Sequence, residues 1–157
     1  MREAFLFAHL AGLLALTAGV GASLACKLAA GRTGSAAAVL ALLETAHGAV
    51  RRCALPGSFL LLASGIGLVA ASHDAWSMTE PWIVGAFALW CGSAVVGIRL
   101  HAPRSRRTRA LAADLAATGA PVTGHLRALV RGGMPATMLD SALLAAMVAL
   151  MVFKPGS

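Results

Sequence analysis

The fold of this chain is decided near its N-terminus by one long apolar run, AFLFAHLAGLLALTAGVGASLAC, which extends from Ala4 to Cys26. Because a helix rises about 1.5 Å per residue and the apolar core of a bilayer is about 30 Å thick, about 20 residues of this kind are enough to cross it. Three further apolar runs follow, at residues 53–71, 81–98 and 134–153. We therefore predict an all-α fold, a four-helix transmembrane bundle formed by a single integral membrane domain over residues 1–157.

The composition of the whole chain agrees with a membrane environment. Of the 157 residues, 59% are hydrophobic and only 12% are charged, against about 25% charged residues in an ordinary soluble domain. A soluble domain of this length could not cover so much apolar surface, so a soluble globular protein and a disordered chain are excluded. The cysteines at positions 26, 53 and 91 show no CxxC spacing, and we interpret them as small packing residues.

A polar stretch precedes the second apolar run. Residues 36–50 are rich in Ala and Leu but carry Glu44 and His47, and they pass into the second run through a pair of arginines without room for a turn. We predict a helical extension before span two, with a kink or break at Pro56, because proline cannot donate the backbone hydrogen bond there. Glu44, His47 and Arg51 would then form one stripe, either a solvated helix face or a functional cluster.

The stretch from Pro103 to Gly133 is predicted to form a basic amphipathic cytoplasmic segment between spans three and four. Leu111 and Leu115 fall on one side of a first short helix, residues 126–130 supply the apolar side of a second, and residues 119–121 separate the two. Such segments commonly lie on anionic lipid headgroups, each Lys or Arg contributing about 1 kcal/mol. We therefore expect membrane lipids as partners. Nucleic acid is not expected, because no aromatic residues interleave the arginines as a base-stacking surface requires.

The distribution of basic residues predicts the orientation in the membrane. Eleven of the 13 Lys and Arg lie between spans one and two or between spans three and four. The positive-inside rule places both connections in the cytoplasm and both termini outside a bacterial inner membrane, with Trp76 and Trp82 at the outer interface. A signal peptide cleaved after Ala25 would instead leave the basic connections outside, so the first span is retained.

Small residues recur at every fourth position in the spans, and such stripes let helix backbones approach closely. They occur at positions 8 and 12, 63 and 67, 88 and 92, and 141, 145 and 149. A compact bundle accounts for all of them. The same stripes could serve a homodimer or a larger membrane complex.

Two ionisable residues, Asp140 and His9, fall well inside the apolar runs, where such groups are costly. Asp140 lies at the depth at which Arg51 and Arg52 enter span two, so we predict a structural ion pair between them. His9 has no carboxylate at its depth, whereas Met147 and Met151 lie near the same membrane surface. Neutral imidazole with a thioether suits haem b or Cu(I), with His9 and Met147 as metal ligands. The alternative is a His that is hydrogen-bonded within the protein core.

Several short motifs resemble a family of small bacterial four-span inner-membrane proteins of unknown function. These are His9 in span one, Arg-x3-Pro-Gly from position 52 to 57, and Met151-Val152-Phe153-Lys154 near the C-terminus. That family is similar in pattern to the copper-resistance D proteins and the HemJ-type protoporphyrinogen oxidases. The resemblance implies a four-helix bundle that holds one haem, with His9 as an axial ligand, and it leaves the second axial ligand unassigned. Met147 is a candidate for that ligand from its depth alone, and Met151 and Lys154 are further cofactor-binding candidates.

The predicted function is therefore binding of haem b or Cu(I) near the outer leaflet for redox chemistry or metal handling. No catalytic residues are identified, and the chain lacks the fuller set of polar residues expected for porphyrinogen oxidation, which argues against an enzyme. The alternatives are a cofactor-free accessory or structural subunit of a larger membrane complex, and a small transporter of copper or another solute.

Overall fold

The computed structural model describes residues 1–72 and 76–154, and in these ranges it is all-helical apart from one isolated β-bridge between Ser35 and Pro121. The prediction of an all-α fold is confirmed. The elements in chain order are α1 (Arg2–Ala30), α2 (Ala36–Ala49), the π-helical turn η1 (Val50–Ala54), α3 (Leu55–Ala70), α4 (Pro81–Val96), the π-helical turn η2 (Gly97–His101), α5 (Ala102–Ala117), α6 (Gly124–Gly132) and α7 (Met134–Phe153).

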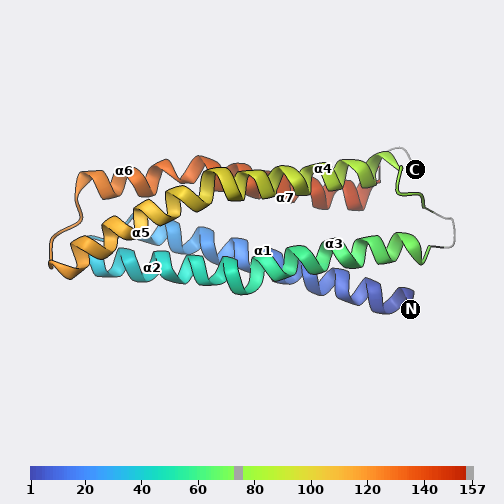
Figure 1. The fold of residues 1–157 in the computed structure, drawn as a ribbon, viewed down its shortest axis with the longest axis horizontal. Helices are drawn as coiled ribbons and strands as arrows, with labels where there is room; N and C mark the ends of the chain where they lie inside the picture. Colours follow the sequence, from blue (N-terminus) through green and yellow to red (C-terminus); the bar gives the residue numbers. More distant parts are fainter. Residues whose placement is uncertain (73–75, 155–157) are drawn as a thin grey trace.

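These elements form two long helical hairpins that lie against one another as two layers (Figure 1). In the first hairpin α1 packs along α2, η1 and α3, and in the second α4 packs along α7 while α5 packs on α6. We call the end where α1 begins and α7 ends the terminal end, and the end formed by α2, α5 and α6 the basic end. The hairpins touch extensively through α2 and α5, but in the other half they meet mainly through α1 and α7.

Four continuous helical stretches are long and apolar enough to cross a membrane: Arg2–Ala30, Ala36–Ala70, Pro81–Ala117 and Gly124–Phe153. This confirms the predicted number of spans. Every stretch except the first extends well beyond the apolar run that predicted it, because the polar residues between the runs are themselves helical.

The sequence predicted a kink or break at Pro56, but the second helical stretch does not break there. The helix continues from Ala36 to Ala70, and the wide turn η1 ends just before the proline. A π-helical turn shifts the backbone pairing by one residue, which accommodates a residue that has no N–H to donate. The same arrangement recurs where η2 precedes Pro103 in α5.

The amphipathic residues of the basic end pack into a small core of their own. Val39, Leu43, Ala112, Leu126 and Val130 are buried there against Ala30. The helical extension before span two therefore covers the apolar sides of α5 and α6. A cross-hairpin ion pair lies beside this core, with Arg109 Nη1 3.2 Å from Glu44 Oε1. The partner of Glu44 is thus on α5, whereas His47 and Arg51 are exposed.

Backbone-to-backbone contact joins α1 to the second helical stretch. A Cβ atom added to Gly12 would lie 2.7 Å from Leu61 N, and one added to Gly57 would lie 2.6 Å from Leu16 N. Only glycine permits this approach. Of the predicted small-residue stripes, those that contain Gly12 and Gly67 lie in this interface, since a Cβ added at Gly67 would lie 2.5 Å from the Phe5 ring on α1. Gly92 has no atom within 4 Å of an added Cβ.

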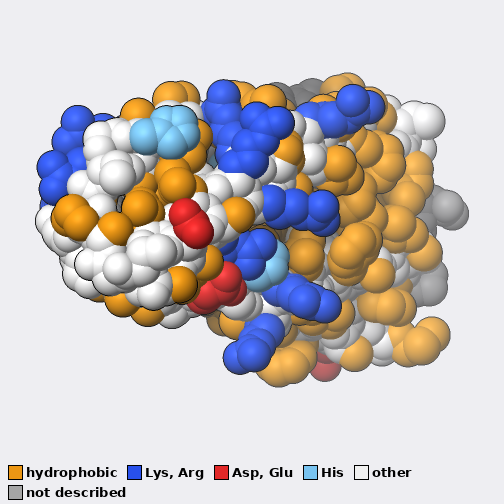
Figure 2. All heavy atoms as spheres, turned by 60° about the vertical axis from the view of Figure 1, so that its left-hand side comes forward, with side chains coloured by type: hydrophobic (Ala, Val, Ile, Leu, Met, Phe, Trp, Pro, Cys, Tyr) orange, Lys and Arg blue, Asp and Glu red, His pale blue; other side chains and the backbone are white. Residues whose placement is uncertain are grey.

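Charge is distributed unevenly along the molecule. Figure 2 shows Lys and Arg side chains gathered toward the basic end, whereas the remainder of the visible surface is mostly hydrophobic. The exposed hydrophobic residues include Phe7, Leu14, Phe59, Val95 and Ile98, at 59–75% exposure. This is the surface expected of helices that face lipid tails.

Candidate functional site

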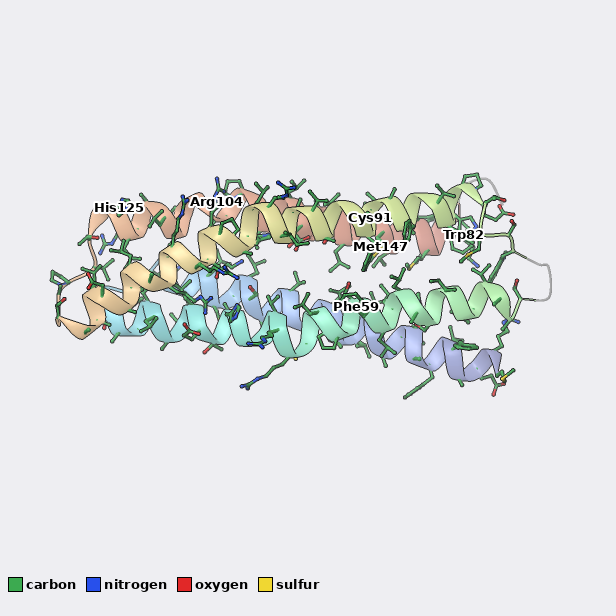
Figure 3. The ribbon with its side chains drawn as sticks, viewed as in Figure 1. Phe59, Trp82, Cys91, Arg104, His125 and Met147 are labelled. Atoms are coloured by element: carbon green, nitrogen blue, oxygen red, sulfur yellow. The ribbon has the colours of Figure 1, made fainter. Side chains whose placement is uncertain are left out.

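A cavity of about 480 Å³ lies between the two hairpins in the half of the molecule nearest the terminal end, and we call it the terminal cavity. Residues from α1, α3, α4 and α7 line it, so it occupies the part of the bundle where the hairpins touch least. Met147 and Trp82 lie on the side of the α4–α7 layer that faces the other hairpin (Figure 3). Most of the lining is apolar, which is typical of small-molecule and cofactor sites.

All four cofactor-binding candidates from the sequence line this one cavity: His9, Met147, Met151 and Lys154. His9 comes from α1 in the first hairpin, Met147 and Met151 come from α7 in the second, and Lys154 directly follows α7. Met147 is 5% exposed and forms an apolar cluster with Leu61 and Ala86. The structure thus brings together residues separated by more than 130 positions.

The hydrogen bonds around His9 favour one tautomer of its ring. His9 Nδ1 lies 3.2 Å from Ser64 Oγ. The Ser64 hydroxyl donates to the backbone, with Ser64 Oγ 2.5 Å from Leu60 O and 3.2 Å from Leu61 O. A Ser64 hydroxyl that donates to the backbone leaves Oγ to accept a hydrogen bond from His9 Nδ1–H, and in that tautomer the neutral ring carries its lone pair on Nε2. This is the arrangement in which histidines bind metals, with the other nitrogen fixed by hydrogen bonding.

The His9 ring packs against Gly65, where the absence of a side chain leaves space for it. A Cβ added at Gly65 would lie 3.2 Å from His9 Cε1 and 3.5 Å from Nδ1. The ring therefore packs against bare backbone on α3. A side chain at this position would press on the ring and change its orientation.

Aromatic and basic groups surround the mouth of the cavity at the terminal end. Lys154 Nζ lies 4.3 Å from the ring centroid of Trp76 and 5.6 Å from that of Trp82, and Arg2 lies 5.9 Å from Trp76. Trp76 and Trp82 contact one another edge to face. Trp82 is 9% exposed and its Nε1 has no hydrogen-bond partner. The mouth thus offers positive charge and an unpaired N–H donor.

Part of the cavity wall belongs to the lipid-facing surface. Leu6, Ile66 and Phe87 line the cavity and are each about half exposed, at 47–53%. The cavity therefore opens sideways onto the apolar surface of the bundle.

The predicted ion pair between Asp140 and Arg51 or Arg52 is not formed. Both arginines are exposed, and between residues 1–72 and 76–154 the only ion pair within 4 Å joins Arg109 to Glu44. Instead, Ser93 Oγ on α4 donates a hydrogen bond to Asp140 Oδ1. Arg51 and Arg52 lie within η1, and their side chains are exposed.

Sequence reasoning missed the polar partners of two predicted residues, Ser64 beside His9 and Ser93 beside Asp140. It also missed two interhelical hydrogen bonds, Trp90–Ser58 and Lys27–Thr137. Lys27 Nζ on α1 donates to Thr137 Oγ1 on α7 at 3.1 Å. Serine and threonine are common in transmembrane helices as backbone-bonded residues, so their identity alone carries no signal. No group of three or more His, Cys, Asp or Glu that could hold a metal occurs in the described part of the chain. The three cysteines are free thiols, and Cys53 is exposed.

The four long apolar helices and the largely hydrophobic surface define a four-span integral membrane protein. The chain belongs to a family of predicted integral membrane proteins (DUF2269), whose model matches residues 4–155. Comparison with curated proteins and comparison with solved structures each gave no match. The predicted class is thereby confirmed, whereas the similarity to copper-resistance D and HemJ-type proteins stays a prediction.

Proposed function

We propose that the terminal cavity binds a flat apolar redox cofactor, best matched by haem b, with His9 Nε2 as an axial ligand. The observation that supports this most directly is the hydrogen bond from His9 Nδ1 to Ser64, because it leaves Nε2 unprotonated in a cavity that Met147 and Met151 also line. Haem iron takes His together with Met in electron-transfer proteins.

The residues present fit such a group in size, polarity and charge. The cavity volume of about 480 Å³ lies within the range of about 300–1,000 Å³ that is usual for cofactor sites. Its walls are apolar, as a porphyrin face requires, and Arg2 and Lys154 lie at its mouth, where carboxylate groups would be stabilised. When bound, haem would supply one-electron transfer, and the protein would supply ligation, orientation and exclusion of water.

Copper(I) is the second candidate, because a soft cation favours thioether and imidazole ligands. Copper binding is supported by the terminal cavity itself, because His9, Met147 and Met151 all line it. If the cavity holds only lipid, the alternative function applies, a cofactor-free accessory or structural subunit of a larger membrane complex.

The test is purification from cells supplied with haem and copper, followed by absorption spectroscopy and metal analysis. We expect a Soret band in the wild-type protein and its loss in His9→Ala, with a monodisperse protein retained because the helix is rich in Ala and Gly. His47→Ala is the matched control, since His47 is exposed on α2. Wild-type protein without haem or copper, or His9→Ala protein with its full complement, would exclude His9 as a ligand.

We further propose that the protein lies in a bacterial inner membrane with the basic end in the cytoplasm and both termini outside. The exposed arginines 104, 106 and 107 on α5 support this orientation, because basic residues remain on the cytoplasmic side and attract anionic headgroups. Lipid is the partner proposed for this end. The glycine Gly92, open on the surface of α4, is available for a homodimer or a larger membrane complex.

A further inference from the structure

The lining of the terminal cavity decides which kind of molecule it favours. The side chains around it leave a space of about 480 Å³, and most of them are aliphatic, methionine or aromatic. The polar side chains on the lining are His9, Lys154 and the three tryptophans, and Trp90 Nε1 is already bonded to Ser58. A buried water needs about 2–4 polar partners, so these walls favour an apolar molecule over water.

The cavity has its side opening between α3 and α4. Trp90 joins these two helices at the base of the cavity, through its hydrogen bond to Ser58 and its edge contact with Phe59. Elsewhere within residues 1–72 and 76–154, α3 and α4 share no extended packing contact. Ile66 on α3 and Phe87 on α4 line the cavity and are 47% and 53% exposed, so they form the two rims of the opening.

The opening lies at the depth of the lipid acyl chains. Phe87 follows the first residue of α4, Pro81, by six positions, which corresponds to about 9 Å along the helix. Ile66 lies two residues after Ser64, which contacts His9, and His9 is about 10 Å from the start of α1. In a hydrocarbon core about 30 Å thick, both rims are therefore surrounded by acyl chains and not by headgroups.

The mouth of the cavity at the terminal end has the chemistry of a headgroup site. The guanidinium of Arg2 lies 5.9 Å from the ring centroid of Trp76, and Lys154 Nζ lies 4.3 Å from it. Tryptophan is enriched at the level of the headgroups, and Arg and Lys attract their phosphate groups. Phosphate at the mouth and hydrocarbon at the opening are the two parts of one phospholipid.

We infer that the terminal cavity is a binding site for a phospholipid from the leaflet at the terminal end. One acyl chain enters between Ile66 and Phe87 and lies along the apolar walls down to Trp90, and the phosphate group lies beside Arg2. The lipid is bound without covalent change and exchanges with the bilayer. Only its displacement by a cofactor rests on the proposed function.

The first test is fluorescence quenching by brominated lipid. All three tryptophans of the chain line the cavity, and Trp76→Phe with Trp82→Phe leaves Trp90 as the single reporter at its base. The protein is purified without added cofactor and placed in nanodiscs of phosphatidylglycerol that is brominated on its acyl chains. We expect strong quenching of Trp90 relative to nanodiscs of the same lipid without bromine.

Two adjacent residues of α4 provide a matched pair of variants for this test. Ile83 lines the cavity, whereas Val84 is 52% exposed and does not line it. Ile83→Phe should lower the quenching of Trp90 by about twofold or more, because the larger ring occupies space that the chain would fill. Val84→Phe should leave the quenching unchanged. Equal quenching in the two variants would overturn the inference, because Trp90 would then meet only lipid outside the bundle.

The second test is native mass spectrometry of the wild-type protein in detergent. We expect one retained phospholipid per chain, its loss in Ile83→Phe, and a weaker preference for phosphatidylglycerol over phosphatidylcholine in Arg2→Gln. Protein that retains no phospholipid, or Arg2→Gln with an unchanged preference, would contradict the site.

Both tests are made without haem, so their failure is distinguishable from failure of the proposed function. A retained lipid in a protein that never binds haem would remove the proposed function and leave this inference standing. Where haem binds, saturation with it should expel the retained lipid. A protein that carries haem and the lipid together would contradict a shared cavity.

Discussion

Trp90 Nε1 donates a hydrogen bond of 2.8 Å to Ser58 Oγ, and this contact joins α4 of one hairpin to α3 of the other. The Trp90 ring also stacks on Phe87 and meets Phe59 edge to face. One side chain therefore links the hairpins and closes the base of the terminal cavity.

Trp90→Phe should loosen the hairpins in the membrane half. The variant keeps an aromatic ring beside Phe87 but loses the bond to Ser58, at a cost of about 1 kcal/mol in the free energy of unfolding. Spin labels at the exposed positions Ile66 and Val84, in a cysteine-free background, should show a broader distance distribution than in the wild type. Phe87→Leu is the control, because it retains the bond. Identical distributions in wild type and Trp90→Phe would mean that other contacts hold the hairpins.

Gly12→Ala should destabilise the first hairpin. The new Cβ would lie 2.7 Å from Leu61 N, which is backbone and cannot move independently of α3. Overpacking of this kind costs about 1–3 kcal/mol, measurable by denaturant-induced unfolding in detergent. The same substitution at Gly92 meets no atom within 4 Å and should be neutral or slightly stabilising, because alanine favours the helix. Equal effects at both positions would contradict the close α1–α3 contact.

The core of the basic end should contribute far more stability than its ion pair. Leu126 is completely buried, so Leu126→Ala should cost about 2–5 kcal/mol and reduce amide protection in α2, α5 and α6. Glu44→Gln removes the partner of Arg109, but the Glu44 side chain is 53% exposed and the cost should be at most about 1 kcal/mol. Hydrogen exchange measured on both variants compares the two losses of stability. A larger loss in Glu44→Gln than in Leu126→Ala would contradict the prediction.

Reporter fusions should establish the proposed orientation. A phosphatase fused after Ser157 should be active, as expected of a periplasmic location, whereas one inserted at Gly119 should be inactive. Gly119 has a φ of +64° in the exposed turn between α5 and α6, where an insertion disturbs no packed helix. A fluorescent protein at each position should give the opposite pattern. The reverse results would exclude the orientation predicted from the distribution of Lys and Arg.

The sequence predicted the membrane class, the number of spans and the helix pair at the basic end, because these depend on local apolar content and periodicity. It also nominated His9, Met147, Met151 and Lys154, which all line the terminal cavity; their role as ligands stays a prediction. It did not predict the partners of polar residues. Those depend on rotation of each helix about its own axis, and a π-helical turn changes that rotation without a recognisable motif.

Asp140 illustrates why the sequence did not predict the partners of polar residues. Its depth matched that of Arg51 and Arg52, but the structure turns the arginines outward and leaves Ser93 as the hydrogen-bond donor. The stripe at Glu44, His47 and Arg51 likewise gave no indication that Arg109 would approach Glu44 from a different helix.

The sideways opening of the terminal cavity has a consequence for any ligand that reaches it. Leu6, Ile66 and Phe87 form both the cavity wall and the lipid-facing surface, so an apolar molecule would enter from the bilayer and not from water. Its effective concentration is then its mole fraction in the membrane, set by partitioning. Occupancy measured in detergent would fall as micelles are added at constant ligand, and affinities are meaningful only when the ratio of ligand to lipid is held fixed.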